Sequence, residues 1–102
     1  MPLSRNVQAT SDYIDIFGQA QASFPYTGTA AQSSAIGRTG IYDIWSDQDC
    51  YIKVATTADD VTTSTGYLLR ANNTITMLVR ETHKIGAIRS SASGTLYYHK
   101  VG

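Results

Sequence analysis

The chain has 102 residues, a length that predicts one domain able to bury about two thirds of the surface exposed by its unfolded form. Its 13 Thr, 10 Ser and 7 Tyr, against one Glu and five Leu, favour β structure over a helical domain. Eight basic residues balance eight acidic ones, which argues against nucleic acid and against a membrane as main partners and leaves little charge repulsion between copies.

The first 39 residues are mostly polar. We expect residues 1–17 to form an N-terminal arm or an edge strand, and residues 13–17 within them are a short strand candidate that ends at Gly18. Residues 1–10 lack a basic region followed by an apolar run, so no secretion signal is predicted. Residues 18–39 are rich in Gln, Ala, Ser, Thr and Gly, which predicts a low-complexity surface loop that contributes little to the core.

Residues 40–55 contain two apolar runs with the period-two alternation of half-buried strands, separated by the polar connection Ser-Asp-Gln-Asp. This pattern predicts a β-hairpin whose inward side chains include Cys50, Ile52 and Val54. The hairpin holds the single Trp and the single Cys, and we interpret it as the centre of a core formed by residues 40–102. A lone Cys cannot form an intrachain disulfide, so we interpret Cys50 as a small buried thiol.

The remaining chain alternates between short strands and turn signals. Residues 56–65 predict a loop without a buried pattern. Residues 67–70 and 74–80 predict a second hairpin, joined by a turn in which Asn can adopt positive φ. Two more strands are expected over residues 85–89 and 95–101.

Together these elements give about eight short strands, with turn signals about every eight to twelve residues. Successive antiparallel strands should close two sheets over one core, because a single sheet of this size would leave an apolar face in water. We therefore predict an all-β fold: a single-domain antiparallel β-sandwich, jelly-roll-like. The nearest competitor is an immunoglobulin-like sandwich, which is disfavoured by the missing Cys pair and by the position of Trp45 directly before a polar connection.

Residues that could carry catalysis are few. The two histidines, His83 and His99, show no recognisable arrangement with a nucleophile, and one Cys with two distant histidines does not supply a zinc site. The Gly-Arg-Thr-Gly run at residues 37–40 lacks the Lys and the following helix of a phosphate-binding loop. The sequence therefore predicts that the protein is not an enzyme, with no catalytic residue and no cofactor.

Two pairs of carboxylates offer the oxygen ligands that Ca²⁺ prefers: Asp47 with Asp49, and Asp59 with Asp60. Too few oxygen ligands cluster around either pair, so we interpret these residues as turn and solubilising residues and predict no metal site.

Aromatic side chains offer a possible binding surface. Tyrosines and Trp45 can stack against a sugar, and jelly rolls often bind carbohydrates, although tyrosine is also common at protein interfaces. Tyr97 and Tyr98 are adjacent, so in a strand they point to opposite faces and one of them is expected outside, where it favours contact with a partner.

Four segments carry a resemblance to a known family: residues 41–54 (IYDIWSDQDCYIKV), 66–69 (GYLL), 84–88 (KIGAI) and 93–98 (SGTLYY). Their pattern resembles small virion proteins of tailed bacteriophages, the cement or decoration proteins that sit on icosahedral capsids. The resemblance covers the C-terminal two thirds of the chain and contains no catalytic signature. It implies a jelly-roll-like β-fold and a location on the capsid surface of the virion, after synthesis in the host bacterial cytoplasm.

The function expected from this resemblance is a structural virion protein that binds the outer capsid surface and stabilises the shell. Its partners would be the major capsid protein, in many copies per particle, and further copies of itself, as a dimer or trimer. Many copies of a compact clip can stabilise a shell because modest binding energies add through multivalency. The alternative is a carbohydrate-binding β-sandwich module of a phage tail or host-recognition structure, with a surface glycan as ligand.

The polar N-terminal region is expected to become ordered on contact with a partner chain, while exposed aromatics of the body form an interface between copies. The candidate interface residues are Tyr13, Ile14, Ile16, Phe17, Tyr97 and Tyr98.

Overall fold

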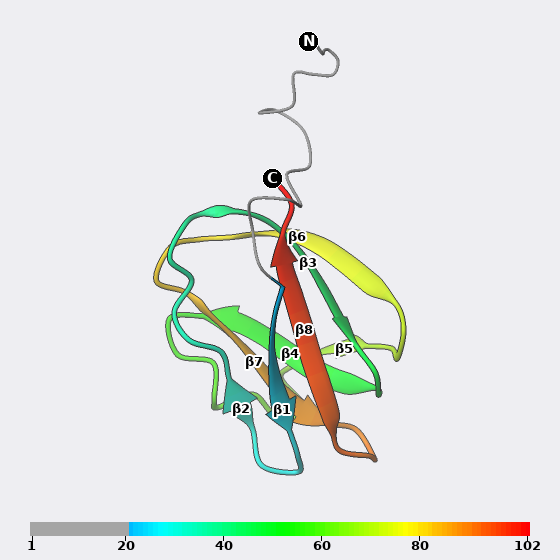
Figure 1. The fold of residues 1–102 in the computed structure, drawn as a ribbon. Helices are drawn as coiled ribbons and strands as arrows, with labels where there is room; N and C mark the ends of the chain where they lie inside the picture. The colour runs from blue at the N-terminus through cyan, green and yellow to red at the C-terminus, as the bar shows by residue number, and fades with distance from the viewer. Residues whose placement is uncertain (1–20) are drawn as a thin grey trace, which may run out of the picture.

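The computed structural model describes residues 21–102, and these residues form eight strands and no helix (Figure 1). The predicted arm over residues 1–17, with its strand candidate at residues 13–17, lies outside the described residues. The strands are β1 (Ala22–Tyr26), β2 (Ala31–Gln32), β3 (Gly40–Ser46), β4 (Cys50–Ala55), β5 (Tyr67–Leu69), β6 (Thr74–Val79), β7 (Lys84–Arg89) and β8 (Gly94–Lys100).

The strands form two antiparallel sheets of four. Sheet A has the order β1-β8-β3-β6, and sheet B has the order β2-β7-β4-β5. The first strand pairs with the last, the second with the seventh, the third with the sixth and the fourth with the fifth. This is the pairing of one long hairpin rolled up over two sheets, which is how a jelly roll is built. The predicted fold, an antiparallel, jelly-roll-like β-sandwich, is therefore confirmed.

Both predicted hairpins are wrong, although their strands lie at the expected positions. β3 belongs to sheet A and β4 to sheet B, while β5 belongs to sheet B and β6 to sheet A. Each short connection therefore crosses from one sheet to the other, and in the second connection Asn72 has the expected positive φ of 63°. The alternation of apolar residues shows which side of a strand is buried, but it is the same whether the next strand lies beside it or across the core.

The region 18–39, expected as a surface loop, contains two strands in its described part. β1 pairs with β8 over five residues, and its Tyr26 is among the largest fully buried side chains of the described residues. The sequence signal was weak because Pro25 interrupts the strand pattern and small polar residues surround it. A Pro is compatible with β1 because this strand lies at the edge of sheet A.

The core lies between the two sheets, and Ile44 on β3 is fully buried in it. Cys50 and Ile52 are buried as predicted, and Val54 is half-buried and packs against the core. Trp45 lies on the opposite side of β3 from Ile44, so it faces away from the core. The largest side chains with less than 2% exposure are Tyr26, Ile44, Ser46, Cys50, Val61, Leu69, Val79, Ile85 and Leu96.

The connection between β4 and β5, predicted to lack buried residues, covers the outer side of sheet B. Ala58 is fully buried and Val61 is 1% exposed. The backbone N–H of Ala58 donates to Oε1 of Gln32 on β2 at 3.0 Å. Gly86 on β7 lies directly beneath, where any Cβ atom would clash with the carbonyl group of Ala58. Two small or β-branched residues in a Thr-rich run are a weak signal, which is why the sequence pattern missed this contact.

Candidate functional site

The outer side of sheet A carries two of the three exposed large hydrophobic residues among residues 21–102, Ile41 and Leu78. We call it the outer A face and define it by side chains that alternate with the core-facing ones. Strand register arranges them in three rows, which are apolar, polar and aromatic in turn. The outer A face consists of Ile41, Asp43, Trp45, Thr76, Leu78, Tyr97 and His99.

The aromatic row contains a stacked pair. Trp45 on β3 lies opposite Tyr97 on β8, with ring centroids 5.7 Å apart and ring planes inclined by 12°. Both residues are half-buried. An offset stack of this kind fixes the two rings against each other and presents a rigid aromatic surface to solvent.

The apolar row and the polar row lie beside this pair. Ile41 and Leu78 are register partners with 37% and 46% of their surface exposed. In the row between them and the aromatic pair, the hydroxyl of Thr76 donates to Oδ1 of Asp43 at 2.6 Å, and His99 is the register partner of Asp43 on β8. A surface with apolar contact area and hydrogen-bonding groups side by side has the composition of a protein-binding or sugar-binding surface.

The structure places only two of the six candidate interface residues, because Tyr13, Ile14, Ile16 and Phe17 lie outside the described residues. Tyr97 is on the outer A face. Tyr98 points to the other side, packs against the core and contacts Phe24 edge-to-face, with ring centroids 6.5 Å apart. Sequence reasoning missed Ile41 and Leu78, since alternation alone does not show which outer face stays open.

A buried polar cluster joins β1 to the start of the β3–β4 connection. The hydroxyl of Tyr26 lies 2.5 Å from Oγ of Ser46 and 2.9 Å from the carbonyl oxygen of Gln48. Burial raises the pKa of Tyr26 to about 12, and burial also raises the pKa of the Cys50 thiol beside it. Both groups therefore stay protonated at neutral pH, so the thiol of Cys50 is a poor nucleophile and the cluster acts as structural packing.

Asp47 and Asp49, the first pair considered as calcium ligands, accept backbone hydrogen bonds. Oδ1 of Asp47 accepts a hydrogen bond from the N–H of Thr95 at 2.9 Å, and Oδ1 of Asp49 accepts one from Ala71 at 2.7 Å. Within residues 21–102, no three His, Cys, Asp or Glu side chains gather in a way that could hold a metal ion.

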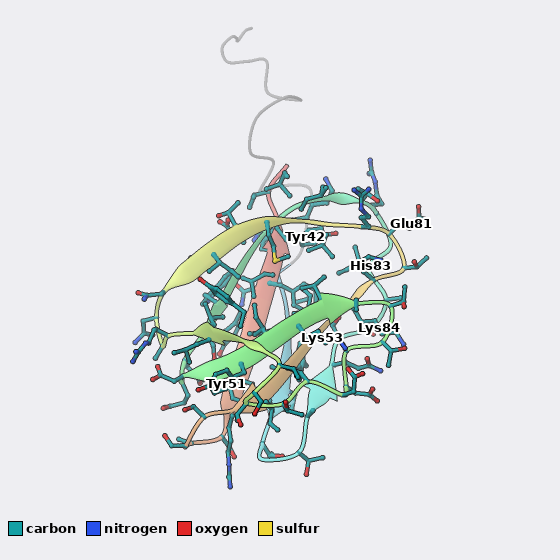
Figure 2. All side chains as sticks on the ribbon, turned by 180° about the vertical axis from the view of Figure 1, so that it is seen from behind. Tyr42, Tyr51, Lys53, Glu81, His83 and Lys84 are labelled. Atoms are coloured by element: carbon teal, nitrogen blue, oxygen red, sulfur yellow. The ribbon has the colours of Figure 1, made fainter. Side chains whose placement is uncertain are left out.

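On the outer side of sheet B, Asp60 pairs with Lys53 at 2.7 Å. This hydrogen bond from the lysine lowers the pKa of the Asp60 carboxyl. Figure 2 shows Lys53 on β4, and His83 with Lys84 at the turn that leads into β7. His99, in contrast, belongs to β8 of sheet A, whereas His83 lies in the turn that leads from β6 of sheet A to β7 of sheet B.

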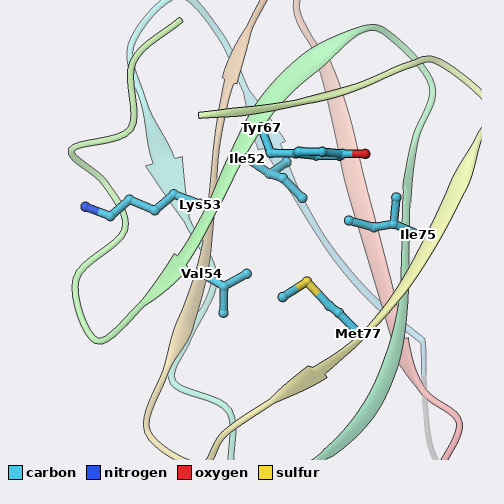
Figure 3. Close-up of a pocket in the computed structure, with 6 residues that line it drawn as sticks. All are labelled: Ile52, Lys53, Val54, Tyr67, Ile75 and Met77. Atoms are coloured by element: carbon cyan, nitrogen blue, oxygen red, sulfur yellow. The ribbon is translucent and has the colours of Figure 1, made fainter. Parts of the chain in front are cut away.

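An apolar groove opens where the edges of the two sheets meet (Figure 3). It has a volume of about 340 Å³ and is lined by Ile52, Lys53, Val54, Tyr67, Ile75 and Met77. We call it the edge groove. Ile75 and Met77 of β6 approach Ile52 and Val54 of β4 across it, while the amino group of Lys53 points away. Four of the six lining residues are aliphatic or Met, so the groove is suited to apolar contact.

No protein-family model, curated protein or solved structure matches this chain. The described residues also include no helix with the length and apolar character needed to cross a membrane.

Proposed function

We propose that the protein is a structural virion protein of a tailed bacteriophage, a cement or decoration protein that binds the outer capsid surface through the outer A face. Two observations support this proposal. Four segments of the chain resemble small capsid-bound virion proteins, and the fold is the jelly-roll-like sandwich that this resemblance implies. The protein acts by binding and not by catalysis, and the major capsid protein is its partner.

The observation that carries the proposal is the difference between the two outer faces. On sheet B, residues 56–66 cover the sheet and bury Ala58 and Val61. On sheet A, Ile41 and Leu78 stay exposed beside the stacked Trp45 and Tyr97. Exposed apolar side chains in a row do not stabilise a protein that stays in solution. When a partner covers them, the apolar surface removed from water contributes favourably to the binding free energy.

Many weak contacts are enough for such a role. Each copy on a capsid contributes a modest binding free energy, and copies that bridge neighbouring subunits add their contributions across the shell. A neutral chain has little charge repulsion to limit dense packing of copies, since eight basic residues balance eight acidic ones.

Co-sedimentation with purified capsids tests the proposal. We expect the wild-type protein to bind at high copy number, and Leu78→Asp to reduce the bound amount at least tenfold because it places a charge in the apolar row. Thr63→Asp, an exposed position in the loop over sheet B, is the matched control and should bind as the wild type does. Equal binding by both variants would show that the outer A face is not the capsid-binding surface. Binding of the wild type at only a few copies per particle would point to the tail or the portal vertex.

A second candidate function is carbohydrate binding, as a module of a phage tail or host-recognition structure. The stack of Trp45 on Tyr97 favours it, because aromatic rings beside the polar groups of Asp43 and Thr76 are the combination that sugars bind. A glycan array separates the two functions. A specific glycan signal that is lost in Trp45→Ala would favour the carbohydrate module, whereas a cement protein should give no specific signal.

A further inference from the structure

One of the four sheet edges lacks protection against pairing with another strand. Short length, Pro and charged residues normally protect exposed edges. β2 has two residues, β5 has three, and β1 contains Pro25, which has no N–H to donate. β6 is six residues long and reads Thr-Ile-Thr-Met-Leu-Val, without charge or Pro. Among the described strands it pairs only with β3, so its other edge is available for a further strand.

The edge groove lies directly beside this open edge. β5 pairs only with Cys50, Tyr51 and Ile52 of β4, so the sandwich is not closed beyond this point. There the half-buried side chains of Ile75 and Met77 line the groove, and Tyr67, which is 63% exposed, stands at its mouth. A strand added to β6 would direct every second side chain into the groove and cover these apolar groups.

We propose that residues 13–17 of a second copy of this chain bind here, as a fifth strand of sheet A paired with β6. The sequence Tyr-Ile-Asp-Ile-Phe alternates in the way that such a strand requires. Ile14 and Ile16 lie in the edge groove against Ile75 and Met77. The opposite orientation would bury the carboxylate of Asp15 in a groove whose lining cation, Lys53, points away and pairs with Asp60. The orientation with the two isoleucines inward is therefore favoured.

The donor is a second copy because the chain's own segment is too short. β1 and β6 are the two opposite edges of sheet A, so a strand beyond β6 lies four strand spacings from β1, about 19 Å. The five residue steps from Phe17 to Ala22 span at most about 17 to 18 Å when fully extended. That segment would also have to pass around the intervening strands. A neighbouring copy has no such restriction, and it supplies the homo-oligomer contact.

Disulfide cross-linking between two differently tagged chains tests this pairing. Both chains carry Cys50→Ala, which removes the single native thiol; one adds Ile16→Cys and the other Met77→Cys. After mild oxidation we expect a mixed disulfide dimer at a yield at least tenfold above that of a control in which Thr63→Cys replaces Met77→Cys. Equal yields with the two acceptors would overturn the proposal. A chain that carries both substitutions and forms only an internal disulfide would overturn it as well.

Sedimentation of the protein in free solution gives an independent measurement that needs no engineered thiol. The wild type should form a dimer or trimer, and Ile16→Asp should convert it to monomer, whereas Ser11→Asp, outside the paired segment, should leave the oligomer intact. An oligomer that persists in Ile16→Asp would show that copies associate through another surface and would overturn the proposal. Capsids are absent from both experiments, so their outcome does not depend on the proposed capsid binding.

Discussion

At the scale of single residues, the hydroxyl of Tyr26 links stability to pH. Its pKa is raised by burial from 10.0 to about 12 in the folded protein. The pKa of Tyr26 is higher in the folded protein than in the unfolded chain, so the unfolded chain loses this proton first as the pH rises. The contribution of the protonated hydroxyl to the free energy of unfolding is therefore complete below pH 10 and is lost as the pH rises from 10 to 12. The difference between the two pKa values corresponds to a loss of about 2 to 3 kcal/mol in the free energy of unfolding.

Tyr26→Phe tests this linkage. At pH 8 we expect the free energy of unfolding to fall by about 1 to 2 kcal/mol, because the hydroxyl of Ser46 loses a buried hydrogen bond and the carbonyl of Gln48 loses a part-buried one. At pH 11 the variant and the wild type should differ much less, since Phe has no proton to lose. Urea unfolding at both pH values measures the two differences. If the difference in the free energy of unfolding between the wild type and Tyr26→Phe is the same at pH 8 and pH 11, the role of Tyr26 in alkaline unfolding is contradicted.

The close approach of Gly86 to Ala58 leads to a second prediction at this scale. Gly86→Ala places a methyl group against the backbone of residue 58, so the loop over sheet B must move. We expect a loss of about 1 to 3 kcal/mol in the free energy of unfolding, the cost typical of overpacking. Gly37→Ala is the matched control, because a Cβ there meets no atom within 4 Å. Similar urea midpoints for the two variants would contradict tight packing of the loop.

At the scale of elements, the sequence indicated where the later strands lie but not which sheet each one joins. Alternation in residues 40–55 and 74–79 located β3, β4 and β6, since a half-buried strand must alternate. The partner of each strand depends on contacts between distant residues, such as Trp45 with Tyr97, and no local pattern encodes them. The buried Tyr26 was missed for the same reason, because its partners Ser46 and Gln48 lie about twenty residues away.

The N-terminal arm is the element whose role in capsid binding we predict separately from the outer A face. Deleting residues 1–11 leaves all described strands and the segment 13–17 in place. If the arm becomes ordered on the capsid, its loss removes contact area, and we expect capsid binding to weaken by about tenfold, or about 1.4 kcal/mol. Titration of purified capsids with the full and shortened chains measures this. Unchanged binding would remove residues 1–11 from the proposed interface.

At the scale of the whole molecule, fold class was predictable and the binding surface was not. A neutral, Thr-rich chain with regular turn signals has few ways to bury its apolar side chains other than a sandwich. Which outer face stays open depends on whether the loop between β4 and β5 folds back over sheet B, and only the buried Ala58 and Val61 show that it does. The exposure of Ile41 and Leu78 follows from that asymmetry, so it became visible only with the three-dimensional structure.

The role of the whole molecule as a shell stabiliser leads to the last prediction. A ligand that binds the assembled capsid more tightly than its separated subunits stabilises the assembly by mass action. Added wild-type protein should therefore raise the temperature at which capsids dissociate, and the increase should saturate when the binding sites are full. Leu78→Asp should give no increase at the same concentration, while Thr63→Asp should match the wild type. Light scattering during a thermal ramp measures the transition. A protein that binds at high copy number without shifting it would decorate the capsid without reinforcing it, and the stabilising role would have to be abandoned.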